Sequence, residues 1–293
     1  MVNTGKYVVA VSGGVDSVVL LHMLVKDGFP ISQPPFPNPQ FIVAHFDHGI
    51  RPESGDDAEF VRTLADKYGV PFETRREELG KGASEEFARN RRYAFLNEVA
   101  KKYAGKIVTA HHADDVIETI AINIVRGTGW RGLAVLGSPN IERPLLDKTK
   151  AELIEYAHKN NLEWREDSTN SDTKYLRNNL RRKLIGLDDD TKQLLRMYRE
   201  RQCYIRKTVD DEASEIAGES PYSRYLFINA PRKASLELLR ATLVKQAGTA
   251  PTRPQMKRAL LAIKTYHGGS QYEVAEGVSL SFTKTHFVVH TKG

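Results

Sequence analysis

The chain has 293 residues, 40% of them hydrophobic and 27% charged, a composition typical of a soluble globular protein of about two domains. No apolar run approaches the roughly 18–20 residues of a membrane span, and the first residues lack the form of a signal peptide, so we expect a cytoplasmic protein without a membrane partner. The single cysteine, Cys203, excludes an intrachain disulfide, a Cys-x-x-Cys redox pair, a cysteine-ligated iron–sulfur cluster and a zinc ribbon.

The net charge of +6 is unevenly distributed along the chain. Residues 1–170 carry 21 Lys and Arg against 24 Asp and Glu, whereas residues 171–293 carry 22 against 13. The near-neutral first part is predicted to be catalytic. The basic second part is predicted to bind a polyanion, for which nucleic acid is the preferred candidate. A solvated basic surface is the alternative.

Strands and helices are predicted to alternate along the first part of the chain. The strands are expected at Lys6–Val11, Phe41–Phe46, Val70–Glu73 and Lys106–Ala110, and the helices at Asp16–Lys26, Asp56–Tyr68, Glu85–Tyr103 and Asp114–Val125. A Pro-rich loop at 30–39 interrupts this series. The alternation predicts an α/β fold with a doubly wound, mostly parallel sheet, in which ligands bind at the carboxyl ends of the strands.

The alternation stops near Leu187. One long charged helix is predicted over Asp190–Ala217, followed by helices at Lys233–Gln246 and Arg253–Tyr266 and by a hairpin around Gly277. We therefore expect three parts: a catalytic domain at 1–186, a connector helix at 187–218, and a small α+β domain at 219–293.

The turn Ser12-Gly13-Gly14-Val15-Asp16-Ser17 joins the first strand to the first helix. Its two glycines let the backbone approach an anion that faces a helix N-terminus, so the turn predicts a phosphate site. It is not a Walker A loop, because it has no lysine. A carboxylate beside a phosphate needs a bridging cation, so Asp16 predicts Mg²⁺. An ordinary Gly-rich turn is one alternative, and Ala10-x-Ser12-x-Gly14 also approaches the nucleophile elbow of hydrolases.

Two further segments follow strands and should reach the same crevice. They are His45 to Arg51 and His111 to Asp115. Their spacing matches no known zinc site, and carboxylates beside phosphate favour magnesium. Asp115 lies in the first turn of a helix, where it can meet a cation, although plain N-terminal helix acids are the alternative reading.

Basic side chains supply candidates for anion contacts. Arg89 and Arg92 share a helical face and suit phosphate clamping, whereas Arg91 is expected to be solvated. A later basic stretch suits contacts with a nucleic-acid backbone through Arg177, Arg181 and Arg182. The segment Gly127-Thr128-Gly129-Trp130-Arg131-Gly132 matches a dinucleotide-binding motif, but it follows a helix rather than a strand, so we reject that interpretation.

Taken together, these segments resemble the PP-loop ATPases, whose turn has the sequence Ser-Gly-Gly-x-Asp-Ser, and within that family the chain is similar to the tRNA(Ile)-lysidine synthetases. The resemblance covers roughly residues 7–185 in seven ordered blocks. They are Ser12–Ser17, Ala44–Arg51, Ala88–Tyr93, Thr109–Thr119, Arg126–Leu133, Arg143-Pro144-Leu145 and Glu166–Arg181.

The resemblance implies a tRNA-modifying ligase. ATP would activate C2 of the wobble cytidine in an isoleucine tRNA with a CAU anticodon, and free L-lysine would then displace AMP. It implies an ATP site of Ser12, Gly13, Gly14, Val15, Asp16, Ser17, Ala44 and His45, with catalytic roles for Asp16, Arg89, Arg92, His111 and Asp115. Asp16 and Asp115 would hold Mg²⁺, and the domain at 219–293 would bind tRNA.

Three other functions remain open at this stage. A thiolating PP-loop enzyme would need paired cysteines, and an amidating one would have no use for the basic second part. The third is an RNA-binding module whose nucleotide loop is structural. The sequence leaves the oligomeric state open, a homodimer included.

Overall fold

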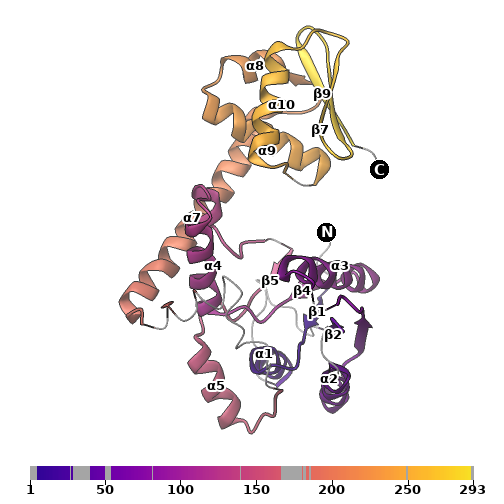
Figure 1. Cartoon of the computed structure of the whole chain (residues 1–293), viewed down its shortest axis with the longest axis vertical. Helices are drawn as coiled ribbons and strands as arrows, with labels where there is room; N and C mark the ends of the chain where they lie inside the picture. Colours follow the sequence, from indigo (N-terminus) through magenta and orange to yellow (C-terminus); the bar gives the residue numbers. More distant parts are fainter. Residues whose placement is uncertain are drawn as a thin grey trace. The chain divides into compact units, whose positions relative to one another are not determined.

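In the computed structural model the described residues are 5–26, 28, 40–49, 54–80, 82–138, 140–165, 180, 183–184, 186–248 and 250–291. The chain divides into two compact units, Met1–Arg199 and Glu200–Gly293 (Figure 1). The Pro-rich loop at 30–39 lies outside the described residues. Among the helices that are described, none is long and apolar enough to span a membrane.

The first unit is built on a five-stranded parallel sheet. Its strands are β1 (Lys6–Ala10), β2 (Gln40–Asp47), β3 (Phe72–Arg76), β4 (Lys106–Val108) and β5 (Ile141–Glu142), in the order β3-β2-β1-β4-β5. Its helices are α1 (Val15–Lys26), α2 (Ser54–Tyr68), α3 (Glu85–Tyr103), α4 (Ala113–Val125) and α5 (Lys150–Lys159), with a 3₁₀ helix, η1 (Trp130–Leu133). The predicted α/β fold class is confirmed.

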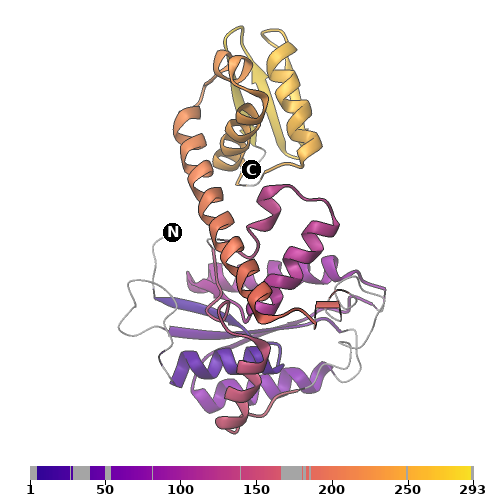
Figure 2. The same ribbon diagram turned by 90° about the vertical axis from the view of Figure 1, so that its left-hand side faces the viewer.

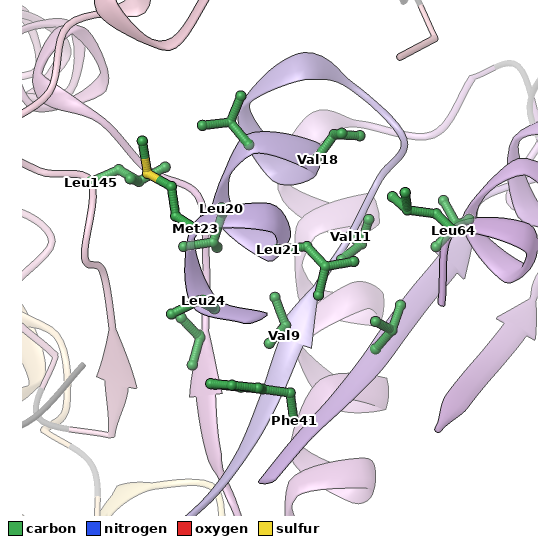
Figure 3. Close-up of a cluster of buried hydrophobic side chains, with 14 of the residues drawn as sticks. Val9, Val11, Val18, Leu20, Leu21, Met23, Leu24, Phe41, Leu64 and Leu145 are labelled. Atoms are coloured by element: carbon green, nitrogen blue, oxygen red, sulfur yellow. The ribbon is translucent and has the colours of Figure 1, made fainter. Parts of the chain in front are cut away.

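Helices cover both faces of this sheet, which explains the continuous apolar sequence of β1 and β2. On one face Val9 packs with side chains of α1 and α2 (Figure 3). Val43 and side chains of α5 belong to the same core. On the other face Val8 and Ile42 pack with α3. Since successive side chains of a strand point to opposite faces, a strand buried on both sides has no polar alternation.

Several local features differ from the sequence prediction: β5 and the 3₁₀ helix of the first unit were not predicted, and the strand predicted at Lys106–Ala110 ends at Val108. The strand predicted at Val70–Glu73 begins at Phe72 instead, because the Val70 amide donates to the Ala65 carbonyl at the end of α2 and Pro71 has no amide to donate. Helix α5 was not predicted. Thr149 is the N-cap of this helix, and the backbone amide and the hydroxyl of Thr149 both donate to the Glu152 carboxylate.

Helix α7 (Asp189–Ala217) is the predicted long charged helix. The second unit contains α8 (Arg224–Asn229), α9 (Arg232–Ala247) and α10 (Arg253–Thr265), with the strands β6 (Tyr222–Ser223), β7 (Gln271–Ala275), β8 (Val278–Phe282) and β9 (His286–Thr291). The strands form an antiparallel sheet in the order β6-β9-β8-β7, with helices packed beside it (Figure 2). The predicted hairpin around Gly277 is β7–β8, so this unit has the α+β character expected from the sequence.

Candidate active site

The candidate site lies where the strand order of the parallel sheet reverses. From β1 the chain passes to β2 on one side, and it later returns to β4 on the other side of β1. The segments that follow β1 and β4 therefore leave the sheet at its carboxyl edge and diverge, which is the place where ligands bind in open α/β sheets. The turn Ser12–Ser17 and the segment His111–Asp115 are these two segments.

The Ser12–Ser17 turn, predicted to bind phosphate, is held by internal hydrogen bonds. Gly13 has φ +92°, a conformation that favours glycine, and its carbonyl accepts a hydrogen bond from the Arg165 amide at 2.9 Å. The Ser17 hydroxyl donates to the Gly14 carbonyl at 2.9 Å and accepts from the Ser12 amide at 3.2 Å. These bonds fix the turn at the start of α1, so its shape does not depend on a bound phosphate.

Asp16, in the first turn of α1, lies between the Lys150 ammonium group and the His112 ring. Its Oδ1 lies 2.7 Å from Nζ of Lys150, and its Oδ2 lies 3.8 Å from Nε2 of His112. His112 immediately precedes α4, and Lys150 is the first residue of α5. The N-terminal ends of α1, α4 and α5 therefore meet at one carboxylate, and a helix N-terminus carries partial positive charge.

His112 is surrounded by acidic side chains. Its Nε2 lies 3.6 Å from Asp115 Oδ2, and its Nδ1 lies 3.5 Å from Asp114 Oδ2. Burial opposes the charged ring, but the neighbouring Asp114 carboxylate and the charges of Asp115 and Asp16 together raise the pKa of His112. The hydrogen bond with His112, assisted by the Lys150 amide, lowers the pKa of Asp114 to about 2.

A second cluster gathers arginines around His111. Desolvation, aided by the positive charges of Arg143, Arg89 and Arg92, lowers the pKa of His111 to about 3 despite the opposing charge of Asp115. The ring is therefore neutral at pH 7. Its Nδ1 is 2.8 Å from the Thr109 hydroxyl, which leaves Nε2 for a ligand.

The three arginines of α3 separate as the helical spacing predicts. The Arg89 guanidinium lies 4.8 Å from the centroid of the Tyr93 ring, and that of Arg92 lies 5.7 Å from it. Arg91 instead makes a bidentate pair with Glu77, with N–O distances of 2.7 and 2.8 Å. Arg89 and Arg92 are also among the positive charges that act on His111. Arg91 is instead paired with Glu77.

Ala44 and His45 are buried at the carboxyl end of β2, beside the turn. His45 Nδ1 lies 2.8 Å from the Val11 carbonyl, and the Val11 amide donates to the Ala44 carbonyl at 3.0 Å. Burial lowers the pKa of His45, so this ring is also neutral at pH 7. Both residues connect β2 to the strand that leads into the Ser12–Ser17 turn.

Two residues of this site were not predicted as site residues from the sequence. Lys150 was not identified because its helix was not predicted, and its partner Asp16 lies 134 residues away. Arg143 was noted only as part of a resemblance, yet its Nη1 donates to the Leu136 carbonyl at 2.8 Å and its charge acts on His111. The candidate tRNA contacts Arg177, Arg181 and Arg182 lie outside the described residues.

The carboxylates of Asp16 and Asp115 are the candidate ligands for a metal ion. Among the described side chains, no group of three or more His, Cys, Asp or Glu residues is arranged to hold a metal ion. Asp16 and Asp115 nevertheless approach the same nitrogen, His112 Nε2, from two helices. Because Mg²⁺ commonly takes one or two carboxylates and completes its shell with water and phosphate oxygens, this pair fits a magnesium ion that arrives with a nucleotide.

Comparison with curated proteins finds relatives named tRNA(Ile)-lysidine synthase. The tRNA(Ile)-lysidine synthase of Thermotoga maritima is 36% identical over 230 residues, which are 72% of this chain and 54% of the relative. That of Thermosipho africanus is 33% identical over 277 residues, which are 86% of this chain and 61% of the relative. The chain spans about half the length of the curated relatives it matches.

A solved structure and a family match agree with the fold. The U34-tRNA thiolase NcsA of Methanococcus maripaludis aligns with a TM-score of 0.56 at 20% identity, over 69% of this chain and 72% of that one, a likeness of fold alone. Residues 2–187 match the PP-loop domain, and this region includes the Ser12–Ser17 turn and every strand of the parallel sheet. The chain therefore belongs to the PP-loop domain family.

Proposed function

We propose that the protein is an ATP-dependent ligase that joins L-lysine to C2 of the wobble cytidine of an isoleucine tRNA with a CAU anticodon. The observation that carries this proposal is the meeting of the Ser12–Ser17 turn, two carboxylates and an arginine cluster at the switch point of a PP-loop sheet. The names of the relatives supply the substrate class.

In the first step the C2 oxygen of cytidine attacks the α-phosphorus of ATP, an O–P bond forms, and the bond to the β-phosphate breaks to release pyrophosphate. The Ser12–Ser17 turn would bind the β- and γ-phosphates through its backbone amides. Asp16 and Asp115 would hold Mg²⁺, which supplies charge neutralisation for the departing pyrophosphate.

Negative charge that develops around the α-phosphate needs donors on the opposite side of the crevice. Arg89 and Arg92 carry permanent positive charge, and neutral His111 offers one N–H. A neutral imidazole donates a hydrogen bond without losing a proton, which suits a step in which charge appears only transiently.

In the second step an amino group of lysine attacks C2, a C–N bond forms, and the bond from C2 to the adenylate oxygen breaks to release AMP and a proton. The tRNA would lie along the basic second part of the chain, including Arg177, Arg181, Arg182 and the domain at 219–293. Each phosphate contact there adds to the salt dependence of binding.

The test is the incorporation of labelled lysine into unmodified isoleucine tRNA with a CAU anticodon, in the presence of ATP and Mg²⁺. A methionine tRNA with the same anticodon serves as the control substrate, and Asp16→Ala as the control variant. Label on the isoleucine tRNA alone supports the proposal. RNA-dependent AMP formation without label would point to another nucleophile, and neither signal would favour an RNA-binding module.

Asp115 is tested separately through the first step. We expect Asp115→Asn to slow pyrophosphate release. The asparagine side chain can still accept the hydrogen bond from the His112 backbone N–H, but it lacks the negative charge. Unchanged pyrophosphate release would show that Asp115 does not have the assigned role.

A further inference from the structure

The N-terminal part of α7 carries a row of basic side chains. Lys192, Arg196 and Arg199 follow one another at spacings of four and three residues, so they share one face of the helix. Leu195 packs with Val135 in the small core that also contains side chains of α4, which holds this part of α7 on the N-terminal unit. The basic row therefore has a defined place relative to the candidate site.

Two members of the row act on the starts of α4 and α5. The contact with His112 is the main cause of the lowered pKa of Asp114, and the charge of Lys192 adds to it. The backbone N–H at the N-cap of α5 is the main cause of the lowered pKa of Glu152, and the charge of Arg196 adds to it. Because exposed charges are screened beyond about 10 Å, the row lies close to the two helix ends that border the candidate site.

The last member of the row, Arg199, shares a carbonyl with Arg143. The Leu136 carbonyl accepts from Arg143 Nη1 at 2.8 Å and from Arg199 Nη2 at 3.3 Å, and Arg199 Nε donates to the Val135 carbonyl at 3.0 Å. Leu136 has φ +54°, a conformation that leucine rarely adopts, so a strained turn presents this carbonyl to both guanidinium groups. Two positive charges therefore meet at an acceptor that carries no net charge.

The described part of the chain pairs neither of these two arginines with a carboxylate. Their hydrogen bonds there go to backbone carbonyls, and Arg143 Nε is buried without a hydrogen-bond partner. Burial and the charges of Arg89 and Arg199 lower the pKa of Arg143, so these positive charges are close enough to repel one another. An oxyanion at this place would receive hydrogen bonds from the remaining N–H groups and relieve the repulsion.

The position of the pair favours a phosphate of a polynucleotide over one of a mononucleotide. Arg143 and Arg89 also act on His111, so the pair borders the proposed reaction centre. A mononucleotide occupies a single place in the crevice, whereas the basic row offers successive positions along α7 for a backbone of repeated negative charges. RNA is the polynucleotide that the proposed function requires.

We propose that Arg199 and Arg143 bind a phosphodiester of the RNA backbone beside the nucleotide that reacts, and that Arg196 and Lys192 continue this contact along α7. The inference rests on the proposed function only in taking RNA as the polyanion. These side chains hold the substrate rather than the reacting atoms, so their loss should weaken RNA binding more than it slows the chemical step.

The first experiment measures binding of a labelled anticodon stem-loop of the isoleucine tRNA by fluorescence anisotropy at several salt concentrations. Near about 50 mM salt we expect Arg199→Met to bind about fivefold more weakly, and the slope of log Kd against log salt to fall by about 0.7, the value for one phosphate of a single strand. Arg199→Lys should keep the wild-type slope, because an ammonium group also contacts phosphate. Arg91→Met is the matched control and should bind like wild type, since Glu77 already neutralises Arg91.

A second experiment removes the charge from the RNA instead of the protein. Single phosphodiesters next to the target cytidine are replaced in turn by uncharged methylphosphonates. One replacement should weaken binding to the wild-type protein several-fold and leave binding to Arg199→Met unchanged, because that variant has already lost the contact. ATP binding without RNA should be equal in the two proteins. Weaker ATP binding with unchanged RNA binding in Arg199→Met would assign the site to the nucleotide and overturn the inference.

The outcomes separate this inference from the proposed function. If Arg199 only braces the turn at Leu136, Arg199→Met and Arg199→Lys will both lower the melting temperature and leave the salt slope unchanged, which overturns the inference. A wild-type protein that does not bind the stem-loop overturns it as well. Lysine incorporation with an unchanged salt slope in Arg199→Met overturns the inference alone. The expected binding results without lysine incorporation would overturn the proposed function and leave the inference standing.

Discussion

The two units of the chain use buried polar side chains in different ways. In the C-terminal unit, buried Arg224 donates to the carbonyls of Ile263, Thr283 and Tyr266 at 2.7 to 2.9 Å, and buried Ser235 and Thr242 donate to nearby carbonyls. These groups join one part of the backbone to another. In the N-terminal unit, buried or half-buried polar groups instead converge on one another at the carboxyl edge of the sheet.

The difference separates structural polar groups from functional ones. The donors of Arg224 all meet backbone carbonyls, so its hydrogen bonds are satisfied within the fold. Side chains of opposite charge gathered around a crevice, with strongly shifted pKa values, mark a site where charge is to be bound. We therefore expect substitutions at the N-terminal site to lower the catalytic rate, and substitutions of the buried polar groups in the C-terminal unit to lower stability.

The largest effect is expected from Asp16→Asn. Loss of the charge removes the partner of Lys150 and one of the two carboxylates proposed to hold Mg²⁺, so pyrophosphate release should fall by about 10³-fold with little change in folding. Rates of pyrophosphate release measure the effect, and Asp66→Asn on the exposed face of α2 is the control. A loss smaller than tenfold would contradict the central place given to Asp16.

We expect Arg224→Met to lower the stability of the C-terminal unit rather than to remove a group of the proposed site. It leaves three carbonyls without their donor, of which that of Ile263 is buried and those of Thr283 and Tyr266 are partly exposed, and we expect this to destabilise the C-terminal unit by about 2 kcal/mol. Hydrogen exchange should accelerate in α10 and β8 and stay unchanged in β1 and β2. Exposed Arg232→Met is the control, and faster exchange in both units alike would refute the separation between them.

The arginines of α3 give a finer comparison within one helix. Arg89→Met and Arg92→Met should each slow pyrophosphate release by about tenfold, because each removes positive charge from the group around His111. Arg91→Met removes the same charge from a residue already paired with Glu77, and it should keep the wild-type rate. Equal losses in all three variants would mean that the helix responds only to its total charge.

Much of this arrangement was predictable from local sequence. The bounds of α3 match the prediction, and the Ser12–Ser17 turn and His111–Asp115 lie at the predicted edge of the sheet. The contact between Lys150 and Asp16 was not predictable, because it depends on how a short, largely polar helix docks beside α1. Local periodicity indicates that a helix forms, but the helix it meets is decided by tertiary packing.

The smallest effect concerns a charged group of the N-terminal unit that lies away from the crevice. Glu73 on β3 accepts hydrogen bonds from Lys102 Nζ at 2.7 Å and the Tyr103 hydroxyl at 2.6 Å, both on α3. These bonds lower the pKa of Glu73 from its ordinary value of 4.5. Because the pKa is lower in the folded state, the stabilisation is complete above about pH 5 and is lost as the pH falls through the lowered value.

Glu73→Gln should therefore destabilise the N-terminal unit by no more than about 1 kcal/mol near pH 7, and the difference from wild type should shrink toward pH 3. Urea unfolding can be followed by the fluorescence of Trp130 and Trp164, since both tryptophans of the chain lie in this unit. Exposed Glu163→Gln is the control. If the difference in unfolding free energy between Glu73→Gln and wild type stays constant with pH, Glu73 stabilises the unit by packing rather than by charge. If that difference shrinks toward pH 3, Glu73 is a structural polar group like those of the C-terminal unit.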